Sequence, residues 1–161
     1  MIRAAIFDAD GTLLDSMGIW QQLGERYLHS HGILPEPGLG NKLYPLSLEE
    51  GCAYLKANYS LPEETSQISK AMEGILRAFY EREATLKPGA EAFLRRLNRE
   101  KIPMIVVTSG HRENLLLAFR RLKIDGCFQG ILTCADFGVS KREPTVYLEA
   151  AARLGATPGE T

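Results

Sequence analysis

The sequence predicts an α/β fold in which a doubly wound parallel sheet is interrupted by an inserted helical cap domain. Three short apolar runs, at residues 2–7, 102–107 and 130–132, have the length and composition of buried strands. Helical patterns follow the second and third runs, and this alternation of strands and helices favours parallel pairing. Only helical patterns occupy the long stretch after the first run, so that stretch is expected to be a separate domain.

The domain boundaries follow from where the alternation stops and resumes. We expect residues 1–15 and 84–161 to form the α/β core and residues 16–83 to form the helical cap. The cap opens with a helix over residues 15–31, predicted from apolar residues at four-residue steps: Ile19, Leu23 and Tyr27.

Two serine-containing segments predict further helix starts in the cap, after a Pro- and Gly-rich break at residues 35–40. Ser47 is followed three residues later by Glu50, and Ser60 is followed by Glu63. A Ser with a Glu at this spacing is typical of a capping box, in which both residues bond the free N–H groups of a helix start.

Three helices are predicted in the second part of the core. The first begins near Pro88. Its inner face is expected to contain Ala92, Phe93 and Leu97. The other two are expected at residues 111–122 and 144–154, and Gly155 is placed to end the last one.

Composition excludes several classes of protein. The 161 residues contain 19 Lys and Arg against 20 Asp and Glu, a net charge of −1, which argues against a nucleic-acid partner. No apolar stretch approaches the roughly 20 residues of a membrane span. The first residues do not resemble a signal peptide, so a cytoplasmic protein is expected. The three cysteines lack metal-ligand spacing and are expected to be reduced.

The first apolar run ends in two aspartates. Asp8 and Asp10 are two residues apart and can project to the same side at the carboxyl end of a strand, where open α/β sheets bind ligands. Repulsion between the two carboxylates favours protonation of one or recruitment of a cation. Gly11 allows a sharp turn directly afterwards. On these residues alone, an acidic strand-to-loop turn without chemistry is the more common explanation.

The segment from Phe7 to Asp15 resembles the first motif of the haloacid dehalogenase-like hydrolase superfamily, in which an apolar strand ends in Asp-x-Asp-Gly-Thr. It is most similar to the subgroup with a helical cap after the first strand, which includes phosphoglycolate phosphatase-like and β-phosphoglucomutase-like proteins. The resemblance implies a Rossmann-like core with an inserted cap, as expected above.

Two later segments resemble further motifs of this superfamily. Thr108 ends the second apolar run, and its hydroxyl would hold a phosphoryl oxygen. The residues after it, Ser109, Gly110 and Arg112, open a helix and are candidate substrate contacts. Lys141 precedes a helix as in the third motif, where a Lys neutralises phosphate and nucleophile.

The chain departs from the family pattern at two places. Arg142 stands where the third motif usually has a Pro. The acidic fourth motif, which completes a Mg²⁺ site in the family, is missing, and Asp136 and Glu160 lie at the wrong places to replace it. We therefore expect the core segment 84–161 to lack its C-terminal part, although a natural truncation that binds metal poorly is an alternative.

The resemblance implies a Mg²⁺-dependent phosphatase acting on a small phosphorylated metabolite. Asp8 would attack phosphorus to form an aspartyl-phosphate, and Asp10 would transfer protons. Asp8 and the backbone carbonyl of Asp10 would bind Mg²⁺, while Thr108 and Lys141 would bind the phosphoryl group. The cap would close over the site, with Lys42 and Tyr44 as candidate substrate contacts.

Several alternatives stay open at this point. A haloacid dehalogenase and a phosphonate-cleaving enzyme are disfavoured because neither uses the second carboxylate, Asp10. A phosphomutase has the same aspartate pair and is not excluded, and the missing fourth motif also permits a non-catalytic binding module. The motifs do not choose among phosphoglycolate, sugar phosphates and nucleotide monophosphates, nor do they specify an oligomeric state.

Overall fold

A computed structural model describes residues 2–161 of the chain. The chain divides into two compact units. One contains Tyr80–Thr161 together with the N-terminal segment up to Ser16, and the other is Met17–Phe79. The division falls inside a helix, a few residues before the boundary after residue 83 that the sequence predicts.

The first unit is an α/β core built on a three-stranded parallel sheet in the order β1-β4-β5. These strands span Ala5–Phe7, Met104–Thr108 and Ile131–Thr133. Phe7 pairs with Val106, and Thr108 pairs with Thr133. The three predicted strands and their parallel pairing are thus confirmed, and their carboxyl ends lie at one edge of the sheet.

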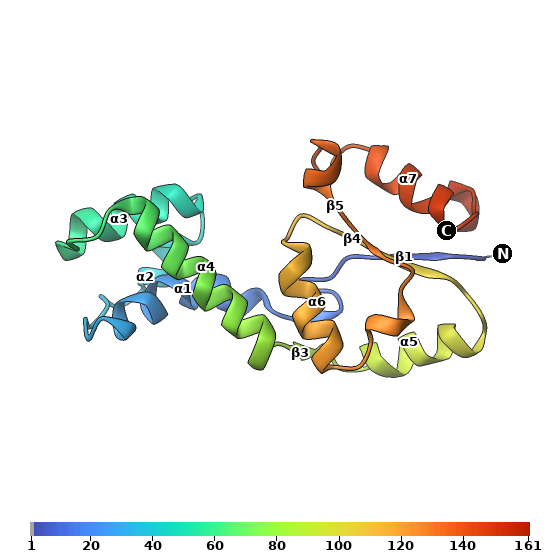
Figure 1. Cartoon of the computed structure of the whole chain (residues 1–161), viewed down its shortest axis with the longest axis horizontal. Coiled ribbons are helices and arrows are strands. Elements are labelled where there is room, and N and C mark those ends of the chain that lie inside the picture. The colour runs from blue at the N-terminus through green and yellow to red at the C-terminus, as the bar shows by residue number, and fades with distance from the viewer. Residues whose placement is uncertain (1) are drawn as a thin grey trace. The chain divides into compact units, whose positions relative to one another are not determined.

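Helices cover both faces of this sheet (Figure 1). Helices α5 (Ala90–Arg99) and α6 (Arg112–Arg121) lie on one face, and α7 (Thr145–Arg153) lies on the other. Short 3-10 helices η1 (Asp125–Cys127), η2 (Cys134–Phe137) and η3 (Pro158–Glu160) complete the connections. The fully buried residues of the core beneath α7 are all aliphatic: Ala4, Ile105, Val107, Leu132, Val146, Ala150 and Leu154. This packing fixes the ends of the strands on which the functional residues lie.

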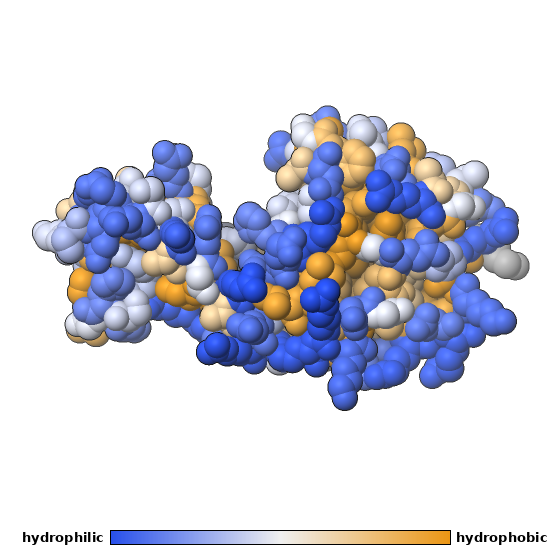
Figure 2. Space-filling model, viewed as in Figure 1, coloured by the Kyte–Doolittle hydropathy of each residue, from blue (hydrophilic) through white to orange (hydrophobic). Residues whose placement is uncertain are grey.

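Strand β1 is an edge strand of the sheet. Figure 2 shows hydrophobic residues gathered on the surface of the core between α7 and α5, next to this edge. A groove of about 410 Å³ lies there, lined mainly by apolar residues that include Ile6, Tyr147 and Leu148. At the start of the strand, Arg3 N and Ala4 N donate to the Glu160 carbonyl, which ties η3 to β1.

The second unit contains helices α1 (Met17–Ser30), α2 (Leu39–Leu43), α3 (Leu48–Tyr59) and most of α4 (Thr65–Arg82). The capping box at the start of α3 is confirmed: Ser47 Oγ accepts from Glu50 N at 3.2 Å, and Ser47 N donates to Glu50 Oε2 at 2.8 Å. In the described part of the chain, no helix has both the length and the apolar character needed to cross a membrane.

The structure corrects the predicted start of the fourth helix. Ser60 does not cap α4; it ends α3 in the left-handed conformation, with φ 51°. Helix α4 begins at Thr65, where Glu64 N donates to Gln67 Oε1 at 2.8 Å. A left-handed residue commonly ends a helix, and Pro62 follows at a position where it cannot extend α3.

Three smaller differences concern local packing. The first helix begins at Met17 rather than residue 15, because Leu14–Asp15 forms strand β2, antiparallel to β3 (Thr85–Leu86). Helix α2 begins at Leu39, within the predicted break. On α5, Ala92 and Phe93 are exposed, and Leu94 joins Leu97 as the buried pair. The exposed Phe93 ring instead contacts Phe7 edge-on, at 6.0 Å between ring centres.

Candidate active site

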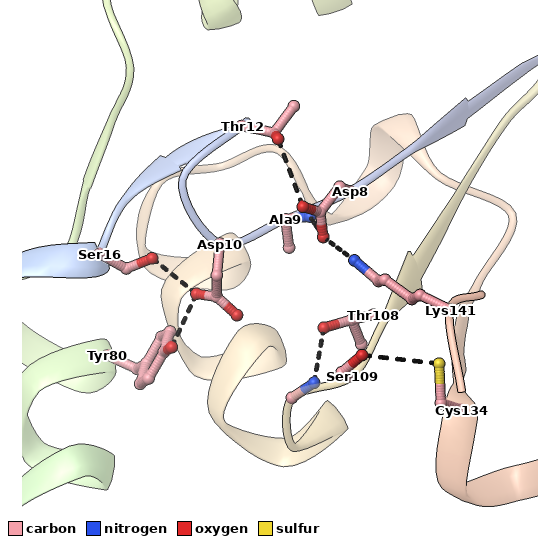
Figure 3. Close-up of polar contacts among 11 residues, drawn as sticks. Asp8, Ala9, Asp10, Thr12, Ser16, Tyr80, Thr108, Ser109, Cys134 and Lys141 are labelled. Atoms are coloured by element: carbon pink, nitrogen blue, oxygen red, sulfur yellow. Dashed lines mark hydrogen bonds and ion pairs between the residues drawn. The ribbon is translucent and has the colours of Figure 1, made fainter. Parts of the chain in front are cut away.

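Asp8 lies directly after β1 and forms an ion pair with Lys141, which is 133 residues away in the sequence. The two carboxylate oxygens of Asp8 have different partners (Figure 3). Oδ1 accepts from Lys141 Nζ and, at 2.8 Å, from Ala9 N. Oδ2 has only a 3.4 Å contact with Thr12 Oγ1, so it is the oxygen left available for another partner.

The turn after Asp8 is held by its backbone. The N–H groups of Thr12, Leu13 and Leu14 all donate to the Ala9 carbonyl, and Gly11 N donates to Leu14 O. Gly11 has φ 80°, a conformation that glycine adopts without strain. None of these backbone hydrogen bonds ends on the Asp10 carbonyl oxygen, which is therefore available to bind a cation.

The carboxylate of Asp10 is held by two hydroxyl groups on the same oxygen. Ser16 Oγ donates to Oδ1 at 2.6 Å, and Tyr80 Oη donates to the same atom at 2.7 Å. Figure 3 shows Asp10 turned toward these residues, while Asp8 turns toward Lys141. The sequence indicates neither Ser16 nor Tyr80 as a site residue.

Tyr80 is buried in the core unit, and this burial together with the negative charge of Asp10 raises the pKa of the phenol far above its usual value. Burial is the larger cause, because it disfavours the phenolate. The hydroxyl therefore stays protonated and remains a hydrogen-bond donor to Asp10 at every pH at which the protein would act.

Thr108 ends β4 and is 1% exposed. Its Oγ1 accepts from Gly110 N at 2.9 Å, so its hydroxyl proton is free to be donated elsewhere. A Cβ atom built on Gly110 would lie 3.1 Å from Asp10 Oδ2 and 3.2 Å from Thr108 Oγ1. Gly110 thus lies close to both site residues, and a side chain there would force one of them to shift.

Besides Gly110, two predicted substrate contacts follow Thr108. Ser109 is exposed, and its Oγ lies 3.6 Å from Cys134 Sγ. Arg112 donates from Nε to Ile131 O at 3.0 Å and also pairs with Asp136. The pKa of Asp136 is lowered, mainly by the N–H of Thr133 and further by Arg112. Arg112 therefore links α6 to β5 and η2, and its contact with a substrate stays a prediction.

A model of the haloacid dehalogenase-like hydrolase family matches residues 2–161. The chain belongs to this family. Hexitol phosphatase A of Escherichia coli (strain K12) is 31% identical over 167 residues, and the match covers 98% of this chain and 71% of that protein. A phosphorylated carbohydrates phosphatase of Thermotoga maritima is 22% identical, with 98% of this chain and 73% of that protein covered.

Solved structures give the same fold. A proposed β-phosphoglucomutase from Thermotoga maritima has a TM-score of 0.88 at 22% identity, and the match covers 98% of this chain and 73% of that one. A subfamily IA member from Geobacter sulfurreducens has a TM-score of 0.78 at 19% identity, covering 99% and 75%. The chain is a haloacid dehalogenase-like hydrolase with the α/β fold of these structures.

The site offers two oxygen atoms of the type that a hard cation such as Mg²⁺ prefers, which is fewer than the six ligands of its full shell. Asp8 Oδ2 and the Asp10 carbonyl are both oxygen donors with room for a further partner. Mg²⁺ is usually bound by one or two carboxylates and completes its shell with water and phosphate oxygens. Within residues 2–161 no cluster of three or more His, Cys, Asp or Glu side chains is placed to hold a metal. The two oxygens therefore fit a magnesium ion that also binds its substrate.

Ser16 and Tyr80 are the residues that sequence reasoning misses. Ser16 lies one residue beyond the first motif, so its nearness to Asp10 along the chain was a usable signal. Tyr80 is 70 residues from Asp10 and sits among the apolar positions of α4. It looks like an ordinary core residue in the sequence, and only the fold brings its hydroxyl to the carboxylate.

Proposed function

We infer that this haloacid dehalogenase-like hydrolase is a Mg²⁺-dependent phosphatase that acts on a small phosphorylated metabolite through an aspartyl-phosphate. The observation that carries this inference is the pairing of Asp8 with Lys141 beside a second carboxylate, Asp10, that is held separately by hydroxyl donors. The names of the two curated relatives, both phosphatases, support the same reaction class.

Asp8 is the proposed nucleophile. One of its carboxylate oxygens attacks phosphorus, a P–O bond to Asp8 forms, and the bond from phosphorus to the leaving oxygen breaks. Lys141 favours this step because its ammonium group lies beside Asp8 and balances the charge of the incoming phosphoryl group. The contacts of Oδ1 with Lys141 and Ala9 N fix the orientation of the Asp8 carboxylate.

Asp10 is the proposed general acid and base. Because Oδ1 accepts two hydrogen bonds, the proton of the neutral carboxyl group belongs on Oδ2, the oxygen nearest Gly110. This proton passes to the leaving oxygen as the P–O bond breaks. The resulting carboxylate then takes a proton from the water that attacks the aspartyl-phosphate, which releases phosphate and restores both aspartates.

Thr108 and Lys141 are proposed to hold the phosphoryl oxygens. The Thr108 hydroxyl has its proton free, and no side chain caps the following helix α6, whose first N–H groups favour an anion. Ser109, Gly110 and Arg112 are proposed as further substrate contacts around this point.

Asp8 and the Asp10 carbonyl oxygen are the atoms proposed to hold Mg²⁺. When bound, the ion would reduce the repulsion between the anionic nucleophile and the phosphate and favour charge on the phosphoryl oxygens. The helical unit, Met17–Phe79, is proposed to be the cap domain.

The test is steady-state hydrolysis of an aryl phosphate by the full chain, with and without added Mg²⁺. We expect activity that depends on Mg²⁺, loss of turnover in Asp8→Asn, and a decrease of about 10²–10⁴-fold in Asp10→Asn, as for loss of a general acid and base. The matched control is Asp15→Asn, which removes a nearby carboxylate that pairs with Lys87 at 2.8 Å. Turnover at the wild-type rate by a folded Asp8→Asn protein would overturn the proposal.

A further inference from the structure

The helical unit contains a pocket of about 330 Å³ that lies wholly within Met17–Phe79. Parts of α1, α2, α3 and α4, with the turn between α2 and α3, form its wall. The wall includes Met17, Trp20, Tyr44, Leu46, Ser47 and Gly51. Its volume falls at the lower end of the range found for small-molecule sites, about 300–1,000 Å³.

The wall of this pocket is apolar and uncharged. No Asp, Glu, Lys, Arg or His lies among the lining residues. Met17, Trp20, Tyr44 and Leu46 all line it, and they are 42%, 36%, 51% and 37% exposed. Leu34 is the only other large apolar side chain exposed in this unit. Exposed apolar side chains that gather around a concavity are typical of a binding site rather than of scattered surface residues.

Gly51 keeps the pocket open. It lies inside α3 and is buried, yet a Cβ atom there would meet only Leu43 Cδ2, at 4.0 Å. An alanine would therefore fit, and it would favour the helix more than glycine does. The empty space beside this buried glycine is part of the pocket, and a larger side chain at this position would fill it.

The aromatic residues of the wall also carry hydrogen-bond donors. Neither the Trp20 indole N–H nor the Tyr44 hydroxyl has a hydrogen-bond partner among residues 2–161. The Ser47 hydroxyl accepts from Glu50 N, which leaves its proton free. A few donors in an otherwise apolar wall would orient a ligand through acceptor atoms.

We propose that this pocket binds an uncharged, mainly apolar ring that carries a hydrogen-bond acceptor. The absence of a cationic side chain in the wall excludes a phosphate group as the recognised part, and the large apolar surface disfavours a polyol. Stacking on Trp20 and Tyr44 suits a flat or saturated ring. The proposal concerns binding by the helical unit and does not depend on the phosphatase activity.

Trp20 allows the proposal to be tested directly, because it is the only tryptophan in the chain. A ¹⁵N-labelled full-length sample therefore gives a single indole N–H signal in the NMR spectrum. We would titrate it with acetophenone, with cyclohexyl methyl ketone and with glucitol, all of which lack phosphate. We expect the two ketones to shift the indole signal saturably and glucitol to leave it unchanged.

Two glycine variants provide the matched comparison. Gly51→Leu fills the pocket and should weaken ketone binding by about tenfold or more, because the ligand loses its apolar contact area. Gly74→Leu places the same side chain on α4, where a Cβ meets no atom within 4 Å, and should bind like the wild type. Circular dichroism would establish that both variants are folded.

A third variant covers the case in which Gly51→Leu does not fold. Tyr44→Ala removes a half-exposed ring from the wall and should also weaken ketone binding. Three results would overturn the proposal: no saturable shift with either ketone, binding of glucitol at least as tight as that of the ketones, or wild-type affinity in folded Gly51→Leu or Tyr44→Ala.

Discussion

Tyr80 Oη donates a hydrogen bond of 2.7 Å to Asp10 Oδ1, joining the last part of α4 to the turn after β1 within the core unit. Ser16 Oγ donates to the same oxygen at 2.6 Å. The two donors fix the orientation of the Asp10 carboxylate group. This orientation leaves Oδ2, the oxygen nearest Gly110, available to exchange a proton in both proposed steps.

Tyr80→Phe tests this relationship, because it removes the hydroxyl and keeps the ring in its buried place. A hydrogen bond to a charged group contributes roughly 1.5–3 kcal/mol. We therefore expect kcat to fall by about tenfold or more, where tenfold corresponds to about 1.4 kcal/mol. The control is Tyr147→Phe, at an exposed position of α7, which should leave kcat unchanged.

Lys141→Ala is expected to lower kcat/KM for an aryl phosphate by about 10²–10³-fold, the effect typical of removing a group that stabilises transition-state charge. Lys141→Arg should not restore full activity, because the planar guanidinium cannot reproduce a compact ammonium beside Asp8. Lys87→Ala is the matched control, since Lys87 also pairs with an aspartate of the core unit, Asp15. Equal losses of kcat/KM in Lys87→Ala and Lys141→Ala would contradict a specific role of Lys141 and would indicate that only the net charge of the core unit matters.

Gly110→Ala places a methyl group 3.1 Å from Asp10 Oδ2 and 3.2 Å from Thr108 Oγ1. One of these two side chains must then shift by a few tenths of an ångström. A misplacement of about 1 Å at a site can lower the rate by roughly 10²-fold, which is the upper limit for this smaller shift. We expect a fall in kcat of about 10–100-fold with a folded protein. Gly130→Ala is the control, because a Cβ at Gly130 meets nothing within 4 Å. A fully active Gly110→Ala enzyme would contradict the proposed position of the transferable proton on Oδ2.

The strands of the core could be predicted because strands buried on both faces read as continuous apolar runs. Strands β2 and β3 could not, since two residues each are too few to show any period. Ser47 and Ser60 have the same sequence signature, yet only Ser47 caps the start of a helix, and Ser60 lies at the end of one. The sequence pattern shows that a serine and a glutamate could form a capping box. Whether a helix starts or ends at that serine depends on how the neighbouring segments pack.

The sequence also did not predict correctly which face of α5 is buried. Phe93 was expected inside because it is large and apolar, but Leu94 and Leu97 are buried instead. In the site, Asp8 and Lys141 carry a recognisable pattern, so their pairing could be anticipated from a resemblance. Tyr80 carries none, because a tyrosine on the apolar side of a helix looks the same whether its hydroxyl meets a carboxylate or water.

The last prediction concerns stability at low pH and rests on Glu160. Its carboxylate accepts from Thr157 N at 3.0 Å and from Thr157 Oγ1 at 2.9 Å, and it pairs with Arg3 at 3.2 Å. These partners, with the Thr157 N–H foremost, lower the pKa of Glu160 to about 2. The pKa is lower in the folded chain than in the unfolded one, so the charged form stabilises the fold. This stabilisation is present above a pH of about 4.5 and is lost as the pH falls toward 2.

Glu160→Gln should therefore lower the melting temperature at pH 6 and flatten its decline between pH 5 and pH 2. The carboxyl group of Glu160 takes up a proton when the chain unfolds at low pH, and this uptake makes stability fall with pH. Glutamine does not titrate, so the variant lacks this contribution to the decline. Thermal unfolding followed by circular dichroism at closely spaced pH values would measure both effects. Glu73→Gln, at an exposed position of α4, is the matched control and should keep the wild-type decline. An unchanged slope in Glu160→Gln would mean that the contacts with Thr157 and Arg3 do not hold the carboxylate in solution.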